Sequence, residues 1–328
     1  MSLKRAKITG VGRYVPEYVL TNAELETLVD TNDEWIRSRT GISERRILKD
    51  PEKATAFMAE KASREALEEA GVDASEIDAI VIATVTPDYI FPATAALVQK
   101  RIGATKAYGF DLSAACSGFL YALSTGGMMI ESGRAKKVLV VGADKMSAIV
   151  DYTDRTTCIL FGDAAGAVVL EEADSGGLID FVHHTEGDED CMLYQPAGGS
   201  LRPASIETVQ NRMHSLRQDG RSVFKKATEG MADVSLEIME RNNLKGDDVA
   251  WLVPHQANLR IINATARRVG LSTDKVMVNI DKYGNTTAAT IPLCLYDWKD
   301  KLKNGDKLIL SAFGGGLTWG AVYLEWNK

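Results

Sequence analysis

Apolar residues at helical spacing fill positions 119–130, with small residues between them. This spacing predicts a buried helix that ends at Gly133, because glycine is common just past the end of a helix. Cys116 lies just before the first turn of the predicted helix. The free N–H groups and the positive dipole end at a helix start favour a thiolate over a thiol. We therefore expect Cys116 to be reactive, with a lowered pKa.

A weak internal repeat of short apolar runs divides the chain in two. The matching runs lie 170 residues apart and are 78–83 with 248–253, and 138–141 with 308–311. Helix-like sequence such as 59–70 precedes these runs, and strands that alternate with helices are typical of largely parallel, buried sheets. The repeat predicts an α/β fold of two pseudo-symmetric halves, 1–175 and 176–328. The end runs 166–171 and 320–325 match each other and indicate an antiparallel edge strand in each half.

Two polar motifs in the second half follow the same logic. His255 comes after an apolar run that Pro254 ends, and a helical pattern begins at Leu259. Open α/β sheets bind ligands at such strand ends, although a structural histidine at the helix start fits equally well. Asn285 lies in a Gly-Asn turn and by itself reads as a turn or cap residue. The repeat places Cys116 and Asn285 before corresponding helices, which predicts one shared central site.

Residues 183–222 interrupt the repeat with a polar stretch longer than ordinary connections. It predicts a lid or a channel wall, and a solvated surface excursion is the other interpretation. His183 and His184 lie near the acidic run 186–190, but no zinc-ligand spacing is present, so we expect no metal.

Composition narrows the function classes. The 328 residues are 45% hydrophobic, and the net charge of −7 argues against a general nucleic-acid binder. Four cysteines without a paired spacing do not make a disulfide scaffold, and they suit a reducing cytoplasm. No apolar run reaches the roughly 18 residues of a membrane span, so we expect no membrane segment.

Three motifs in order, 115–118, 255–258 and 284–286, resemble the β-ketoacyl-acyl carrier protein synthase III family of thiolase-fold condensing enzymes. The resemblance covers essentially the whole chain, from 8–12 to 313–316. Chain-elongating synthases look to use two histidines and thiolases a second cysteine, whereas chalcone-synthase-like enzymes share the Cys, His and Asn and remain the nearest alternative. The resemblance implies a thiolase-like fold with mixed five-stranded sheets in an αβαβα layering.

The resemblance also implies a reaction. An acyl group from acyl-coenzyme A moves onto Cys116, while the backbone N–H groups of Cys116 and Gly315 stabilise the oxyanion. Malonyl-acyl carrier protein is then decarboxylated, His255 and Asn285 hold the enolate oxygen, and the carbanion attacks the acyl-cysteine. This step initiates type II fatty acid synthesis without a metal or redox cofactor, in a homodimer. A secondary-metabolite ketosynthase and a cysteine acyltransferase or hydrolase remain alternatives, whereas a non-catalytic scaffold is expected to lack the nucleophile.

Substrate contacts are also implied by the resemblance. Trp35 and Arg155 match the positions that sandwich the coenzyme A adenine, and stacking with a cation-π contact is the physical reason. Arg39 is expected to meet a phosphate, although exposed arginines are commonly just solvated. The residues also allow Trp35 simply to pack a short helix, capped by Thr31 with Glu34.

The remaining predicted contacts lie nearer the acyl chain and the carrier protein. Phe91 matches the position that shapes the acyl pocket near the dimer interface, and Phe313 is expected to contact substrate. Arg260, Arg267 and Arg268 share one helix face, which suits an acidic carrier protein; ordinary solvated charges are the other interpretation.

Overall fold

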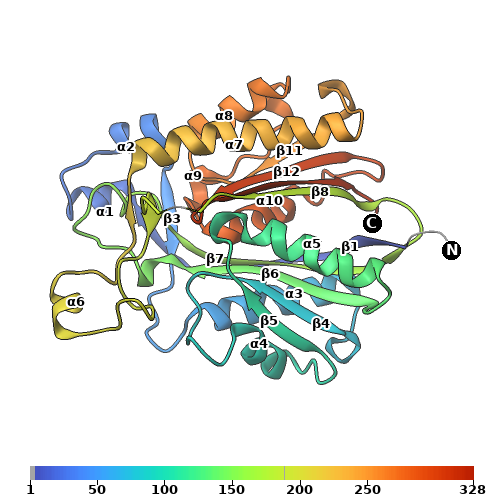
Figure 1. Cartoon of the computed structure of the whole chain (residues 1–328), viewed down its shortest axis with the longest axis horizontal. Coiled ribbons are helices and arrows are strands. Elements are labelled where there is room, and N and C mark those ends of the chain that lie inside the picture. Colours follow the sequence, from blue (N-terminus) through green and yellow to red (C-terminus); the bar gives the residue numbers. More distant parts are fainter. Residues whose placement is uncertain (1–3, 188) are drawn as a thin grey trace.

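The computed structural model describes residues 4–187 and 189–328, and it shows five layers of alternating helices and sheets (Figure 1). The strands of the two main sheets are β1 (Arg5–Tyr14), β4 (Ala79–Ala83), β5 (Tyr108–Leu112), β6 (Lys137–Lys145), β7 (Asp163–Ala173), β8 (Gly177–Thr185), β11 (Trp251–Pro254), β12 (Lys307–Gly314) and β13 (Thr318–Glu325). Smaller two-stranded sheets pair β2 (Tyr18–Thr21) with β3 (Glu44–Ile47), and β9 (Leu193–Tyr194) with β10 (Arg217–Gln218).

The described helices include six that pack on the faces of the two main sheets and several short ones. They are α1 (Asn22–Glu26), α2 (Asp33–Thr40), α3 (Thr55–Ala70), α4 (Thr94–Ile102), α5 (Gly118–Glu131), α6 (Ile206–Gln210), α7 (Gly220–Arg241), α8 (Leu259–Arg268), α9 (Ile280–Tyr283) and α10 (Thr290–Trp298). The predicted helix over 119–130 is confirmed as α5, and Gly133 follows it with a positive φ of 71°. No helix in the described ranges is both long and apolar enough to cross a bilayer.

The first sheet has the order β1-β7-β6-β4-β5. Strand β4 pairs in parallel with β5 and β6, and β7 runs antiparallel to both β6 and β1. The run 166–171 was expected at the edge of the sheet, and that expectation is wrong. Strand β1 pairs with β7 along nearly its whole length and takes the edge position itself.

The second sheet repeats this order as β8-β13-β12-β11. Within the described residues it contains four strands rather than the expected five. The fifth position is occupied only by an isolated parallel bridge between Leu252 and Val276. The two halves are therefore similar in topology but unequal in size.

The register shows that the 170-residue repeat is correct for the order of strands but not for every residue. Ala79 pairs with Val138 in the first sheet. In the second sheet Leu308 pairs with Trp251, two residues beyond the position that a uniform spacing predicts. Because side chains alternate between the two faces of a strand, a shift of two residues keeps the same side chains on the same face of the sheet. The repeat therefore still predicts which side chains are buried.

The layers explain why the strands read as continuous apolar runs. Helices α3 and α4 cover the outer face of the first sheet, α7 and α8 cover the second, and α5 and α10 lie between the sheets (Figure 1). Sheets covered on both faces bury every side chain of their central strands. The core between the sheets mixes residues of both halves, such as Leu120 and Leu310. The chain passes from one half to the other in the turn between β7 and β8.

The described residues of the stretch 183–222 contain more secondary structure than their polar sequence predicts. His183 and His184 belong to β8, where His183 is hydrogen bonded to Ser124 (2.7 Å) and His184 to Glu237 (2.7 Å). The middle of the stretch carries β9, α6 and β10, and α7 begins at Gly220.

Candidate active site

Cys116 lies in one turn of 3-10 helix, Ala115–Ser117, directly before α5. Two hydrogen bonds tie this turn to the second half of the chain: the Ser117 hydroxyl donates to the Thr318 carbonyl (3.0 Å), and the Thr318 hydroxyl donates to the Ala114 carbonyl (2.9 Å). Ala115 has a positive φ of 45°, which is uncommon for alanine and often marks functional sites. The thiol is thus held where both halves meet.

The expected lowering of the Cys116 pKa is wrong. Burial, together with the smaller effect of the buried Asp144 carboxylate, raises the pKa of the thiol to about 12. Desolvation disfavours the charged form of any group, and here it outweighs the helix start. Near pH 7 Cys116 is therefore a thiol, and its proton must leave when it attacks.

His255 follows the last residue of β11 and is almost fully buried. Its backbone N–H donates to the Ser311 carbonyl of the neighbouring β12 (2.8 Å), and its ring Nδ1 lies 2.7 Å from the Thr290 hydroxyl. Burial lowers the pKa of His255 to about 3, so the ring is neutral near pH 7.

Asn285 is held between the two halves by its own backbone. Its N–H donates to the Leu160 carbonyl (2.9 Å), and its carbonyl accepts from Gly162 N–H (3.1 Å). Gly284 before it has a φ of +64°, and a Cβ there would lie 2.7 Å from the Leu160 carbonyl oxygen. The Asn285 side-chain oxygen accepts from Thr287 N–H (2.9 Å), so the amide NH2 is the group left for a ligand.

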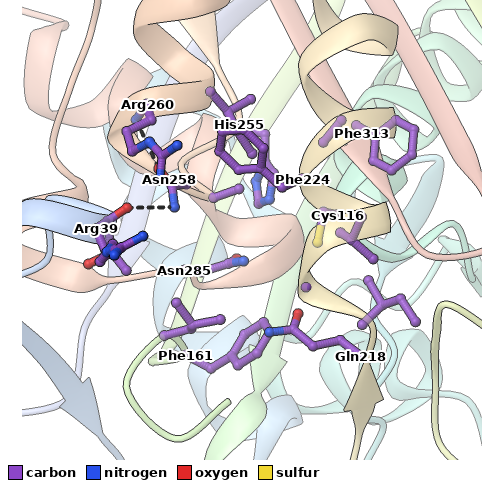
Figure 2. A pocket seen from close by; sticks show the side chains of 18 of the residues that line it. Arg39, Cys116, Phe161, Gln218, Phe224, His255, Asn258, Arg260, Asn285 and Phe313 are labelled. Atoms are coloured by element: carbon purple, nitrogen blue, oxygen red, sulfur yellow. Dashed lines mark hydrogen bonds between the residues drawn. The ribbon is translucent and has the colours of Figure 1, made fainter. Parts of the chain in front are cut away.

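Cys116, His255 and Asn285 line one cavity of about 370 Å³, here called the outer cavity, and Figure 2 shows them on its walls. The thiol comes from the first half, and the imidazole and the amide come from the second. The outer cavity therefore joins a nucleophile, a neutral imidazole and a fixed amide donor, which are the groups that acyl transfer requires.

A second cavity of about 320 Å³, here called the inner cavity, also has Cys116 in its wall. Cys116, Phe161 and Leu193 line both cavities. The inner cavity is lined mostly by apolar and backbone groups, including Val85, Ala114, Met146, Ile149 and Leu216, and Gly315 lies in its wall. A group attached to the Cys116 sulfur has apolar space available on the inner side.

Trp35 and Arg39 line the outer cavity, as the sequence predicts for substrate contacts. The guanidinium of Arg155 lies 5.0 Å from the centre of the Trp35 ring and forms an ion pair with Asp30 (3.2 Å). The predicted cap of this helix is wrong by one residue. Asn32, not Thr31, accepts the hydrogen bond from Trp35 N–H (2.8 Å).

The other predicted contacts divide into two groups. Phe313 and Arg260 line the outer cavity, and Arg260 lies over the Phe224 ring at 4.7 Å. Phe91 lines neither cavity and is 84% exposed, so its predicted role at an acyl pocket depends on a second copy of the chain. Arg267 and Arg268 are exposed at the end of α8, outside both cavities.

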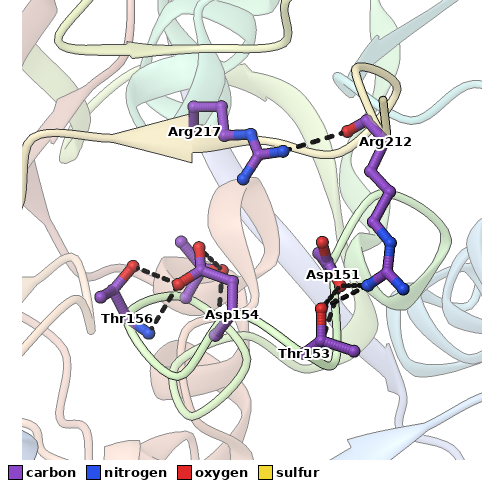
Figure 3. Close-up of polar contacts among 7 residues, drawn as sticks. Asp151, Thr153, Asp154, Thr156, Arg212 and Arg217 are labelled. Carbon is purple, nitrogen blue, oxygen red and sulfur yellow. Dashed lines mark hydrogen bonds and ion pairs between the residues drawn. The ribbon is translucent and has the colours of Figure 1, made fainter. Parts of the chain in front are cut away.

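The segment 193–218 forms a wall of both cavities and is fastened to the loop that carries Arg155. The Arg212 guanidinium binds the Asp151 carboxylate (2.9 Å) and the Thr153 hydroxyl (Figure 3). Leu216 N–H donates to the Ile149 carbonyl (2.8 Å). Of the two interpretations of this stretch, a channel wall describes it better than a solvated excursion.

Sequence reasoning missed several residues that line the site. Leu193, Gln218 and Phe224 border the outer cavity. Leu193 and Gln218 lie in the polar stretch 183–222 and Phe224 lies on α7, and no motif around them indicates a functional role. Phe161 had a signal, since it begins the Phe-Gly-Asp motif of the family resemblance, although no role was assigned to it.

The fold and the site define a class: two similar α/β halves that bring a cysteine, a histidine and an asparagine to one buried junction make a thiolase-fold condensing enzyme. Residues 110–187 match the model of 3-oxoacyl-(acyl-carrier-protein) synthase III, and residues 239–326 match the model of its C-terminal part. A β-ketoacyl-acyl carrier protein synthase III of Chlorobaculum tepidum is 56% identical, over 98% of this chain and 100% of the relative.

Solved structures agree. The 3-oxoacyl-(acyl-carrier-protein) synthase III of Aquifex aeolicus is 46% identical and superposes with a TM-score of 0.90, over 98% of this chain and 100% of that one. The priming β-ketosynthase of the R1128 polyketide pathway is 35% identical with a TM-score of 0.91, over 98% of this chain and 96% of that one. This chain belongs to the β-ketoacyl-acyl carrier protein synthase III family of condensing acyltransferases.

Proposed function

We propose that this protein joins an acyl starter from acyl-coenzyme A to malonyl-acyl carrier protein and releases a β-ketoacyl-acyl carrier protein, the first condensation of type II fatty acid synthesis. The observation that carries the proposal is that Cys116 lines both cavities. The outer cavity suits the thioester arms of both substrates, and the inner cavity suits the acyl chain that stays on the enzyme.

In the acylation step, the Cys116 sulfur attacks the thioester carbonyl as its proton leaves for the neutral ring of His255. The developing oxyanion is held by the backbone N–H groups of Cys116 and Gly315. The ring proton then passes to the coenzyme A sulfur, so coenzyme A departs as a thiol. Trp35 and Arg155, which lie in contact at 5.0 Å in this structure, separate to take the adenine between them, and Arg39 meets a phosphate.

In the condensation step, malonyl-acyl carrier protein occupies the outer cavity that coenzyme A has left. Loss of CO2 gives an enolate, whose oxygen lies against the Asn285 amide and the His255 ring. The carbanion attacks the acyl-Cys116 carbonyl, and the sulfur leaves and regains a proton. These steps use only the groups of the chain, and we propose that the enzyme needs no metal and no redox cofactor.

The same family resemblance supports the proposed partners. Arg260, at the outer cavity, with Arg267 and Arg268 on the same helix, gives a basic face for an acidic carrier protein. Phe91 and its exposed neighbours Tyr89 and Ile90 suit the contact between two copies in a homodimer. The cysteine content suits the cytoplasm, and nothing in the charge favours nucleic acid.

The experiment is a product analysis. The protein is incubated with a panel of acyl-coenzyme A esters, with and without malonyl-acyl carrier protein, and products and protein adducts are identified by mass. We expect an acyl adduct on Cys116 alone, then release of CO2 and a β-ketoacyl-carrier product. Free acid without CO2 indicates a hydrolase instead. Products extended several times, or a strong preference for an unusual starter, favour the chalcone-synthase-like or polyketide-priming alternatives.

A further inference from the structure

The Thr290 hydroxyl is the one side-chain group hydrogen bonded to the His255 ring among the described residues, and it belongs to neither cavity lining. Thr290 is the first residue of α10 and is 2% exposed. Its oxygen lies 2.7 Å from Nδ1 of His255 and 3.1 Å from the Thr287 carbonyl oxygen. A hydroxyl has one proton, so these two contacts decide where the ring proton of His255 is.

One arrangement satisfies both contacts. The Thr290 hydroxyl donates to the Thr287 carbonyl and accepts the Nδ1–H of His255, and Nε2 keeps its lone pair. In the opposite arrangement the hydroxyl donates to Nδ1, and its oxygen then faces the Thr287 carbonyl oxygen at 3.1 Å with no proton between them. Two acceptor oxygens at that distance repel, so the first arrangement is favoured.

The protonation state makes this choice matter. A neutral imidazole carries one proton and can either donate or accept at a given nitrogen, never both. Because burial lowers the pKa of His255 to about 3, the ring is neutral near pH 7. The nitrogen that remains for the outer cavity is Nε2, since Nδ1 is hydrogen bonded to Thr290.

We propose that Thr290 is a positioning residue that holds the His255 proton on Nδ1 and so makes Nε2 the only proton-exchanging nitrogen of the site. The inference rests on the proposed function and adds a residue to it. Acylation requires a bare Nε2, because the Cys116 thiol must give up its proton at the moment of attack. A ring protonated on Nε2 has no lone pair for that proton.

The proton balance of the second step is consistent with this assignment. Acylation is neutral overall, since the thiol proton passes through Nε2 to the leaving coenzyme A. Decarboxylation and condensation end with a Cys116 thiolate, so one proton from solvent is consumed in each turnover. When the malonyl anion is bound, its charge favours uptake of that proton at Nε2. The Nε2–H then donates to the enolate oxygen and finally passes to the Cys116 sulfur.

The direct test is nitrogen NMR of the folded protein with 15N-labelled histidine. The chain has four histidines, and the His255 signals are those missing from His255→Gln. If that variant does not fold, they are the signals that move when the Cys116 thiol is alkylated. We expect the wild-type spectrum to show a protonated Nδ1 and a bare Nε2. A protonated Nε2 in the unliganded enzyme overturns the proposal, whatever the activity of the protein.

Two variants test Thr290 itself. Thr290→Val keeps the shape and removes the hydroxyl, whereas Thr290→Ser keeps it. We expect Thr290→Val to lose the Nδ1–H preference and to slow acylation of Cys116 on the order of 10- to 100-fold, less than the loss of a whole general base. Thr290→Ser should restore both the spectrum and the rate to within about threefold, a rescue that packing alone does not predict. A Thr290→Val spectrum and acylation rate equal to wild type overturn the role of Thr290.

The proposed function is tested separately by the CO2 and β-ketoacyl product of the wild-type enzyme. If that product is absent while the NMR result holds, the reaction is wrong and the tautomer is right. If the product forms and the ring is protonated on Nε2, the proposed reaction is right and the proposed tautomer is wrong.

Discussion

The two halves of the molecule build the same turn and use it differently. In each half a single turn of 3-10 helix precedes the inner helix: Ala115–Ser117 before α5, and Thr287–Ala289 before α10. The first residue of each turn has a positive φ, 45° at Ala115 and 54° at Thr287. The middle residue is Cys116 in one half and Ala288 in the other. The same turn therefore carries a nucleophilic thiol in the first half and an unreactive methyl group in the second half.

The strand beside each turn makes the same contrast. In the first half, the next-to-last residue of β6 is Asp144, whose carboxylate accepts a hydrogen bond from Ala288 N–H (3.3 Å). In the second half, the repeat places Gly314 at the matching position of β12, and a Cβ there would lie 2.7 Å from Cys116 N. A protein carboxylate faces one turn, whereas the other turn faces a residue without a side chain. The active site therefore depends on the absence of a side chain at Gly314 as well as on the presence of the Cys116 thiol.

The largest effect is expected from replacing Cys116 by alanine, the residue at the matching position of the second turn. Cys116→Ala makes the two turns alike, and we expect condensation to fall by at least about 10⁴-fold, since removal of a catalytic nucleophile commonly costs that much or more. Mass analysis should find no acyl adduct. Cys191→Ser, at an exposed cysteine, is the control and should behave as wild type. An acyl adduct elsewhere in Cys116→Ala, with activity kept, contradicts the assignment.

The second prediction separates the donors of the second half from the nucleophile of the first. Asn285→Asp keeps the shape and the oxygen that accepts from Thr287 N–H, but it loses the NH2 donor. We expect Cys116 to acylate at near the wild-type rate, while malonyl decarboxylation slows on the order of 10²- to 10³-fold, the usual cost of one preorganised donor. Asn285→Ala should behave similarly. A parallel fall of acylation and decarboxylation would show that the donors serve both steps.

The division of the chain into two such halves could be predicted from its sequence, because apolar periodicity is local. Runs such as 78–83 and 248–253 predict buried strands whatever surrounds them. The register could not be predicted to the residue, since Leu308 pairs with Trp251 through contacts that only the assembled sheet defines. The same reason explains the edge position of β1, whose partner β7 lies far along the chain.

The identity of the site residues could be predicted because they lie in local sequence motifs. Properties that depend on burial in the folded protein, such as pKa values, could not be predicted. Cys116, His255 and Asn285 were brought together as expected. The pKa of Cys116 was predicted with the wrong sign, because the helix start is visible in the sequence while desolvation and Asp144 are not. Asp144 and Thr290 escaped notice for the same reason: each acts through a partner about 35 to 145 residues away.

The third prediction fills the empty position beside the Cys116 turn. Gly314→Ala places a methyl group against the backbone N atoms of Cys116 and Ser117, at 2.7 and 3.0 Å, so the turn must move. Because a displacement of about 1 Å can cost roughly 10²-fold in rate, we expect acylation to slow by about that factor. Gly199→Ala, where a Cβ meets nothing within 4 Å, is the matched control. Wild-type acylation by a folded Gly314→Ala protein would contradict the importance of that space.

The smallest effect concerns the carboxylate that faces the other turn. Burial raises the pKa of Asp144 from 3.8 to about 6, even though hydrogen bonds from Val85, Thr86 and Ala288 favour the anion. A carboxyl whose pKa is raised by folding stabilises the native state while it is protonated, and this contribution is lost as the pH rises through about 6. Between pH 5 and 7.5 the loss amounts to about 1 kcal/mol.

Asp144→Asn removes this titration, and urea unfolding at the two pH values measures it. The stability of Asp144→Asn relative to wild type should increase by about 1 kcal/mol from pH 5 to pH 7.5. Buried His255, whose pKa is lowered to about 3, loses stability in the opposite direction as the pH falls, but it is present in both proteins and cancels in the difference. A relative stability that is constant with pH would mean that Asp144 titrates as an ordinary carboxyl. The Asp144 carboxylate would then accept the hydrogen bond from the Thr287–Ala289 turn without lowering the free energy of unfolding.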